Sequence, residues 1–370
     1  DYDLGGETDT YKIGADWAPV EDIRFRGSYQ RAVRAPNVIE LFTAQGFGLF
    51  DMDADPCGPA MTATLAECQA TGVPSGAYGS GALDSPAGQY NFLGGGNPDL
   101  EPEESETLTF GAVFRPSFLP GFNLSVDWFN IKIEKLISSV GAVNVIDGCY
   151  TNNVAELCNL INRNAGGQLW IGEGHVVDLA TNIGGLETTG VDVVANYGVD
   201  LADWGMGGAG SLAFSYVGTL LDELVTDTGL GFANSVYDCA GFFGTDACGQ
   251  PNPEYRHRMR VTWKSPWDVD VSGTWRHYSE VEIGILGADG SLNNGGARID
   301  RYFEAENYLD LAAAWQIRDD VRLRAGVNNV LDNDPPVSRS VGAGSGNGNT
   351  YPALYDALGR QFFFGITADF

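Results

Sequence analysis

Basic residues are scarce in this sequence. Among its 370 residues there are 21 Lys and Arg against 49 Asp and Glu, which gives a formal net charge of −28 at pH 7. No Lys or Arg occurs between Arg34 and Arg115, or between Arg163 and Arg256, whereas Asp and Glu are frequent in both intervals. Because nucleic-acid binding depends on Lys and Arg at phosphates, no nucleic-acid partner is expected. The acidic intervals indicate either a solvated surface or a vestibule that disfavours anionic ligands.

Long apolar runs are also missing. No run of 18 or more apolar residues occurs, so the sequence contains no candidate transmembrane helix. The mean hydropathy of −0.12 is typical of soluble proteins. A transmembrane β-barrel is nevertheless compatible with this value, because the inward side chains and the loops of a barrel are polar.

Cysteine is limited to six residues, which form three local pairs inside long segments between predicted strands. The pairs are Cys57 with Cys68, Cys149 with Cys158, and Cys239 with Cys248. Even numbers at local spacing predict disulfides in an oxidising compartment. Zinc is the alternative, but there is no close C-x-x-C motif, and the three histidines (His175, His257 and His277) are dispersed without metal-ligand spacing. We therefore expect three disulfides and no metal site.

The most regular feature of the sequence is an alternation of apolar and polar residues. In the stretch from Asn97 to Leu136, apolar side chains recur at every second position from Leu108 to Phe114 and again from Phe122 to Trp128. Each alternation lasts for roughly the 9–11 residues that a tilted strand needs to cross hydrocarbon. A half-polar strand can cross a bilayer only in a closed barrel, where backbone groups are paired and polar side chains face a wet lumen. The apolar phase slips at Trp128 and Phe129, which predicts a bulge or the emergence of the strand from the bilayer.

The same pattern predicts an all-β fold, an antiparallel transmembrane β-barrel, with about eleven strands over residues 1–370. Short turns and long loops alternate strictly, so all short turns lie on one side, as the periplasmic turns of outer-membrane barrels do, and all long loops lie on the extracellular side. The predicted loops span residues 35–104, 137–174, 226–253, 280–301 and 331–358. Trp17, Phe118, Trp204 and Trp267 lie beside the short turns and predict an aromatic girdle.

The end of the chain has its own signal. Apolar residues occupy every second position of the last predicted strand, at Phe362, Phe364, Ile366, Ala368 and the terminal Phe370. A strand of this kind that ends in Phe resembles the C-terminal assembly signal of bacterial outer-membrane barrels. This resemblance places the C-terminus on the periplasmic side.

Five segments resemble the successive hallmarks of TonB-dependent receptors, in the order of that family. They are RAVRAPNVIELF (31–42), GNPDLEPEESETLTFG (96–111), VDWFNIKI (126–133), NIGGLETTGVDV (182–193) and GVNNVLDNDPP (326–336). The resemblance implies active import of a scarce nutrient across the outer membrane of a Gram-negative bacterium, driven by TonB and its inner-membrane complex. The plug domain and energy-coupling motif of the family are not found in this sequence. Since related transporters have about 22 strands around a plugged lumen, the chain resembles the C-terminal half of such a barrel.

The ligand is predicted only by class. Candidate aromatic contacts in the long loops are Tyr78, Tyr90, Phe92, Trp170, Tyr237, Phe242 and Phe243. The acidic loops argue against an anionic ferric siderophore, and paired loop cysteines are a feature of family members associated with carbohydrates, so an oligosaccharide is expected. A siderophore receptor, a passive porin and a secreted β-rich carbohydrate-binding module remain alternatives. We expect a monomer in outer-membrane lipid, with no cofactor and no enzymatic activity. Gly205 to Gly210 reads GxGxxG, but it lies in a turn between antiparallel strands, so no dinucleotide site is expected there.

Overall fold

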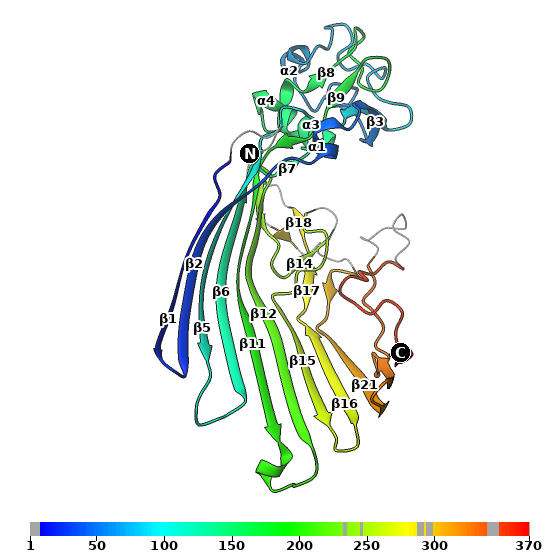
Figure 1. Ribbon diagram of the computed structural model, residues 1–370. Coiled ribbons are helices and arrows are strands. Elements are labelled where there is room, and N and C mark those ends of the chain that lie inside the picture. Colours follow the sequence, from blue (N-terminus) through cyan, green and yellow to red (C-terminus); the bar gives the residue numbers. More distant parts are fainter. Residues whose placement is uncertain are drawn as a thin grey trace.

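A computed structural model describes residues 8–231, 235–244, 247–286, 292–293, 299–338 and 348–369. Its main element is one antiparallel sheet in which eleven strands follow one another in chain order, with β13 (Val236–Asp238) attached to β12 as a twelfth (Figure 1). The eleven are β1 (Tyr11–Val20), β2 (Ile23–Arg34), β5 (Glu103–Phe114), β6 (Phe122–Glu134), β11 (Gly185–Asp200), β12 (Ser211–Asp227), β15 (Tyr255–Lys264), β16 (Val269–Tyr278), β21 (Glu306–Arg318), β22 (Val321–Asn328) and β23 (Gln361–Ala368). The predicted all-β class and the count of about eleven strands are confirmed.

Among the helices of the described residues, none is long and apolar enough to cross a membrane.

The connections are sorted as predicted. Short turns join β1 to β2, β5 to β6, β15 to β16 and β21 to β22 at one end of the sheet, and a turn with the 3-10 helix η1 (Leu201–Trp204) joins β11 to β12 at the same end (Figure 1). The side chains of Trp17, Phe118, Trp204 and Trp267 are all exposed at this end. The described parts of the long connections lie at the opposite end, together with the α-helices of the described residues (Figure 1). Such sorting gives the sheet a turn end and a loop end.

The two faces of the sheet differ in chemistry. Strand pairing places Trp17 opposite Phe25 and Phe110 opposite Trp128, so that the apolar side chains of neighbouring strands stand on one face, here called the apolar face. This face remains exposed. Phe110 has 56% of its surface accessible, Ile13 has 70% and Phe364 has 73%. Large apolar side chains at such exposure over many strands are what a lipid-facing wall requires.

The prediction of a bulge near Trp128 is wrong. Residues Phe122 to Glu134 of β6 pair with β11, and Leu124 to Glu134 pair with β5, without any shift of register. The apolar phase slips because the outward positions beyond Trp128 become polar, beginning at Asn130, whose amide donates to Glu187 at 2.7 Å and Thr189 at 3.1 Å. A register shift occurs instead between β11 and β12, next to Gly190.

Two of the long loops fold together into a separate unit at the loop end, here called the head (residues 35–102 and 135–184). It contains α1 (Val38–Phe42), β3 (Gly46–Asp51), α2 (Leu65–Ala70), β4 (Gln89–Gly94), β7 (Ile137–Ser138), α3 (Ala142–Tyr150), α4 (Ala155–Cys158), β8 (Ile161–Asn162), β9 (His175–Val177) and β10 (Thr181–Asn182). The strands β3, β4, β9 and β8 form a sheet with that order. The second loop is longer than predicted, because Val176 pairs with Phe92 and Ile161 of the head, and β11 starts only at Gly185.

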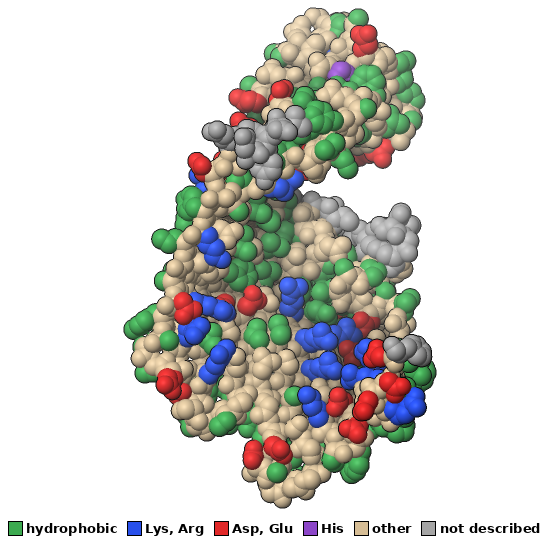
Figure 2. All heavy atoms as spheres, viewed as in Figure 1, with side chains coloured by type: hydrophobic (Ala, Val, Ile, Leu, Met, Phe, Trp, Pro, Cys, Tyr) green, Lys and Arg blue, Asp and Glu red, His purple; other side chains and the backbone are tan. Residues whose placement is uncertain are grey.

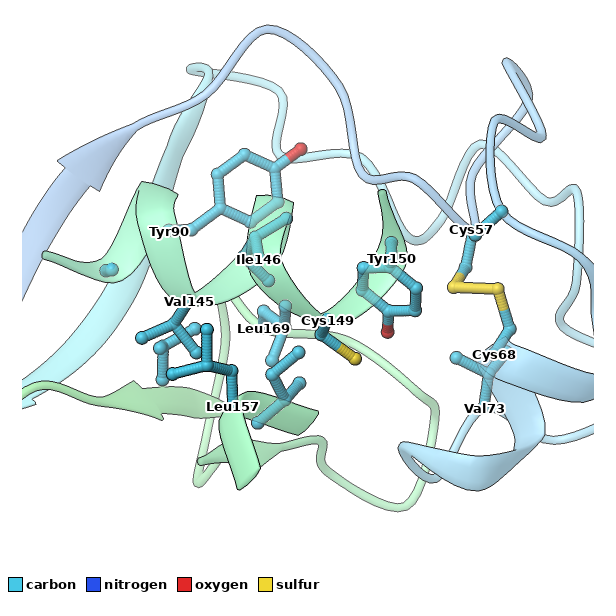
Figure 3. Packing of buried hydrophobic residues seen from close by; sticks show 14 of the residues in the cluster. Cys57, Cys68, Val73, Tyr90, Val145, Ile146, Cys149, Tyr150, Leu157 and Leu169 are labelled. Atoms are coloured by element: carbon cyan, nitrogen blue, oxygen red, sulfur yellow. A yellow bond between two sulfur atoms is a disulfide. The ribbon is translucent and has the colours of Figure 1, made fainter. Parts of the chain in front are cut away.

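The head has a hydrophobic core of its own. Tyr90, Val145, Leu169 and Val176 have no exposed surface, and α3 also contributes Ile146, Cys149 and Tyr150 (Figure 3). Helix α2 begins with a capping box, in which Thr64 accepts from the amide of Glu67 while the Glu67 carboxylate accepts from the amide and hydroxyl of Thr64. These hydrogen bonds hold the pKa of Glu67 below its ordinary value.

A second, smaller core closes the loop end over the later strands. We call it the rim core, and it consists of Phe243, Val281, Ile283, Phe303, Tyr308, Tyr351 and Tyr355. The short strands β14 (Phe242–Phe243), β17 (Val281–Ile283) and β20 (Tyr302–Phe303) form its sheet, and β18 (Ile285–Leu286) pairs with β19 (Leu292–Asn293) nearby. The rim core therefore anchors loop segments directly above β16 and β21.

Candidate functional site

Three arginines stand in a column on the polar face of β15. Arg256, Arg258 and Arg260 alternate with His257 and Met259, and since successive strand residues point to opposite faces, the three guanidinium groups share one face. All three are exposed. Figure 2 shows that Lys and Arg side chains gather over this part of the sheet, around β15, β16 and β21. A chain with a net charge of −28 thus presents a local basic surface.

The column extends sideways through the strand pairing. Arg258 of β15 lies opposite Arg276 of β16, and across β21 the strand β22 adds Arg322 and Arg324. We call these six residues the arginine wall: Arg256, Arg258, Arg260, Arg276, Arg322 and Arg324. The wall lines two cavities. The upper one, of about 420 Å³, is lined by Arg256, Arg258 and Arg276. The lower one, of about 160 Å³, is lined by Arg260, Arg322 and Arg324.

The charges of the wall are compensated unequally. Arg276 is held by two carboxylates, and Arg322 lies 3.6 Å from Asp270. Arg260 donates to the Ser272 hydroxyl at 3.1 Å. Within the described part of the chain, neither Arg256 nor Arg258 has an ion pair or a side-chain hydrogen bond. Guanidinium groups that are exposed in a concave surface and lack a carboxylate partner attract anions from solution.

The other side of the polar face is organised differently. Arg26 of β2 donates to both carboxylate oxygens of Asp127 on β6, at 2.7 and 2.6 Å, which neutralises its charge within the sheet. The intervening strand contributes Gly111, where any Cβ atom would stand 1.9 Å from Asp127 Oδ1. Glycine is thus required at this position so that the ion pair can cross the strand between its partners.

All three predicted disulfides are present. Cys57 is bonded to Cys68, Cys149 to Cys158 and Cys239 to Cys248, each within one long connection. The first two cross-link the head, and the third lies beside β14. Local pairs of this kind stabilise irregular segments that have little regular secondary structure.

The head is also held by a buried ion pair. Arg163 donates to both carboxylate oxygens of Asp55, at 2.6 and 2.9 Å, and neither side chain has any exposed surface. The same guanidinium donates to the Gly167 carbonyl at 2.7 Å and to the Tyr150 hydroxyl at 3.0 Å. Burial by itself would lower the pKa of Arg163, but the Asp55 carboxylate raises it above the ordinary value. Arg163 therefore stays charged inside the head.

The predicted aromatic contacts do not form one surface. Tyr90 and Phe243 are fully buried, because they are centres of the head core and the rim core, so we no longer propose them as ligand contacts. Tyr78 donates to the Ala63 carbonyl and Trp170 to the Ala82 carbonyl, and both rings pack against the head core, as Phe92 does. Tyr237 and Phe242 are half-buried near the third disulfide. The structure therefore brings none of these rings to the arginine wall.

Two of the dispersed histidines meet in space. His257 and His277 stack on neighbouring strands with ring centroids 5.3 Å apart, and Trp275 contacts His257 edge-on at 4.4 Å. They stand on the apolar face with Met259, and His257 is only 8% exposed. No group of three potential metal-binding side chains occurs in the described part of the chain.

The last strand pairs with β22 and presents Phe362, Phe364, Ile366 and Ala368 on the apolar face. The terminal Phe370 lies outside the described residues. The assembly signal stays a prediction.

The arginine wall is the feature that sequence reasoning missed. The strongly negative net charge gave no indication of this cluster of arginines, because most Asp and Glu residues lie elsewhere in the chain. The usable signal was the alternation of arginine at every second residue from Arg256 to Arg260, repeated at Arg322 and Arg324. In a strand, that spacing puts every positive charge on one face.

Comparison with known proteins gives a family match. The family described as TonB dependent receptor-like, beta-barrel matches residues 1–330. No curated protein matches the sequence. Among solved structures, a mutant of the ferric enterobactin receptor PfeA from Pseudomonas aeruginosa is similar with a TM-score of 0.61 at 15% identity, over 100% of this chain and 41% of that receptor. The siderophore receptor PirA from Acinetobacter baumannii is similar with a TM-score of 0.58 at 14% identity, over 100% of this chain and 42% of that one.

These similarities cover the whole described sheet, although the chain spans well under half the length of either receptor. At such low identity the solved structures establish the fold, and the family match establishes the relationship. The family consists of transport receptors of the outer membrane, which separates this chain from general porins and from secreted carbohydrate-binding modules. The chain belongs to the TonB-dependent receptor family and forms part of the β-barrel of an outer-membrane receptor of a Gram-negative bacterium.

Proposed function

We propose that this barrel segment belongs to a receptor that imports an anionic ferric siderophore, with the arginine wall as part of its lumenal binding surface. The observation that carries the proposal is the pair Arg256 and Arg258, which face a cavity of about 420 Å³ without carboxylate partners. Catecholate and carboxylate chelates of iron carry negative charge on planar oxygen pairs, which match the fork of a guanidinium group.

The position of the wall supports this proposal. The apolar face turns outward to lipid, so the polar face with its arginines turns toward the lumen. Positive charge inside a concave, partly enclosed surface raises the local concentration of anions. The acidic loops pointed to a neutral ligand, but Arg256 and Arg258 face the cavity without a carboxylate partner among the described residues. For this reason we favour a charged chelate over the oligosaccharide expected from the sequence.

The solved neighbours add support from outside the chain. One is a receptor for ferric enterobactin and the other a siderophore receptor. Import by such a receptor also requires energy, and the family relationship leads us to propose TonB and its inner-membrane complex as the source. The contact with TonB would be made by parts of the receptor other than this segment.

The test is a charge-neutralising pair of substitutions, R256Q/R258Q, in the full-length receptor. Each charge-assisted hydrogen bond contributes about 1.5–3 kcal/mol. Losing two is therefore expected to weaken binding of ferric enterobactin, used as a probe, by about 100-fold or more. Quenching of tryptophan fluorescence on titration measures the change.

The matched control removes two positive charges from the same face on distant strands, K12Q/R24Q. Lys12 and Arg24 are both exposed, so their loss changes net charge equally without touching the cavity. The control is expected to bind the probe almost as the parent does. Equal affinities of the parent and R256Q/R258Q would contradict the proposal, as would tight binding of maltotriose that no charge substitution affects.

A further inference from the structure

One loop carboxylate already occupies the arginine wall. Asp356 accepts two hydrogen bonds from Arg276, from Nη1 at 2.9 Å and from Nη2 at 2.6 Å. This bidentate arrangement is the geometry with which guanidinium groups bind free carboxylates. Asp356 belongs to the described segment 348–358, at the end of the last long loop, whereas Arg276 belongs to the sheet.

The second partner of Arg276 has a different role. Asp310 of β21 accepts from Nε at 2.9 Å and from Nη2 at 3.0 Å, and its Oδ1 also accepts from the backbone amide of Asn329 at 2.9 Å. Asp310 is thus part of the sheet and orients the guanidinium group. Asp356, by contrast, connects that group to a loop, so breaking its contact would leave the sheet unchanged.

The loop segment covers the cavity that holds the unpaired arginines. Ala353 and Leu354 line the same 420 Å³ cavity as Arg256 and Arg258. When an anion enters this cavity, Nη1 and Nη2 of Arg276 are therefore already bound to Asp356. The two anions compete for one guanidinium group.

The rest of the segment is held mainly by apolar packing. Tyr351 and Tyr355 are buried in the rim core, but the hydroxyl groups of both have no hydrogen-bond partner within the described residues. A buried hydroxyl without a partner destabilises the packed state. The ion pair of Asp356 with Arg276 joins the segment to the wall through two hydrogen bonds.

We propose that Asp356 is a built-in competitor of the anionic ligand, which binds Arg276 in the empty receptor and is displaced when the ligand arrives. Displacement frees segment 348–358 from the wall at the moment of binding. The inference rests on the proposed function, since it needs an anion at the arginine wall. In this proposal Asp356 lowers the affinity of the receptor for the anionic ligand without contacting the ligand itself.

The test compares D356N with D310N in a background that carries A353C as a reporter thiol. The described part of the chain has no free cysteine, so the new thiol can be labelled selectively with a water-soluble maleimide. Without ligand, D356N is expected to accelerate labelling several-fold. D310N is expected to accelerate labelling much less, because Asp356 keeps both hydrogen bonds from Arg276. D356N is also expected to bind ferric enterobactin about 10-fold more tightly, since the competing state is removed.

Two results would overturn the inference. Labelling of D356N at the rate of the parent would show that Asp356 does not hold the segment, and weaker binding by D356N would show that Asp356 assists the ligand. D356A repeats both measurements without the hydrogen-bonding amide that asparagine retains. Failure of the proposed function is recognised separately, because R256Q/R258Q would then bind the probe with the affinity of the parent. The labelling rate measured without ligand does not depend on that result.

Discussion

Replacing Asp55 with alanine is expected to unfold the head and to leave the barrel sheet folded. Removing one partner of a buried ion pair typically costs about 3–5 kcal/mol, because the remaining charge is buried without compensation. Arg163 would lose both hydrogen bonds to Asp55 and keep only neutral acceptors within the described residues, namely Gly167, Tyr150, Thr71 and Cys57. Its side chain has no exposed surface, so water cannot replace the carboxylate without opening the core.

Limited proteolysis of the receptor in native membranes measures this effect. D55A should be cleaved within residues 35–102 or 135–184 at protease concentrations that leave the parent intact, whereas the strands remain protected. D53A is the matched control, because Asp53 is an exposed aspartate two residues away. A cleavage pattern of D55A identical to that of D53A would mean that the ion pair does not stabilise the head.

Arginine on the apolar face of β11 is expected to impair the barrel, whereas arginine at the adjacent residue is tolerated. Val193 lies opposite Val126 and Gly218 on the apolar face, and Val194 lies opposite Ser125 and Val217 on the other face. A lipid-facing Arg near the middle of the bilayer costs about 2–4 kcal/mol, and lumenal positions avoid this cost. The two residues share a strand, a residue type and half-buried surroundings, so each serves as the control for the other.

Urea unfolding of full-length V193R and V194R in phospholipid vesicles gives the two free energies of unfolding. V193R is expected to be less stable than V194R by about the cost of a lipid-facing charge. Equal stability of the two variants would contradict the assignment of faces, and greater damage from V194R would reverse it.

The barrel strands were predictable because their signal is local. Alternation from Leu108 to Phe114 fixes which side chains share a face, and the turn-rich segments between strands fix the order of connections. The disulfides were predictable for the same reason, since each links cysteines in one connection. The course of β6 beyond Trp128 was not predictable. A strand whose inward side chains become apolar shows the same shift of the apolar alternation in sequence as a strand with a bulge.

The head and the arginine wall depend on contacts between distant segments. Tyr90 looked like an exposed loop ring, but the second loop covers it with α3 and β9, and pairing of Phe92 with Val176 leaves no local trace in the sequence. Arg163 and Asp55 are 108 residues apart. Similarly, Arg276 meets Asp356 from a loop 80 residues later. Single-sequence patterns cannot identify such partners, because nothing in the local spacing links them.

The most direct test of the account places one reporter thiol at each of two neighbouring residues of β15, as R258C and M259C. The account puts residue 258 on the water-filled side of the wall and residue 259 against lipid. In outer-membrane vesicles, a charged maleimide should label R258C rapidly and M259C only after denaturation. Equal labelling of both variants, or faster labelling of M259C, would contradict a barrel wall with its arginines toward the lumen.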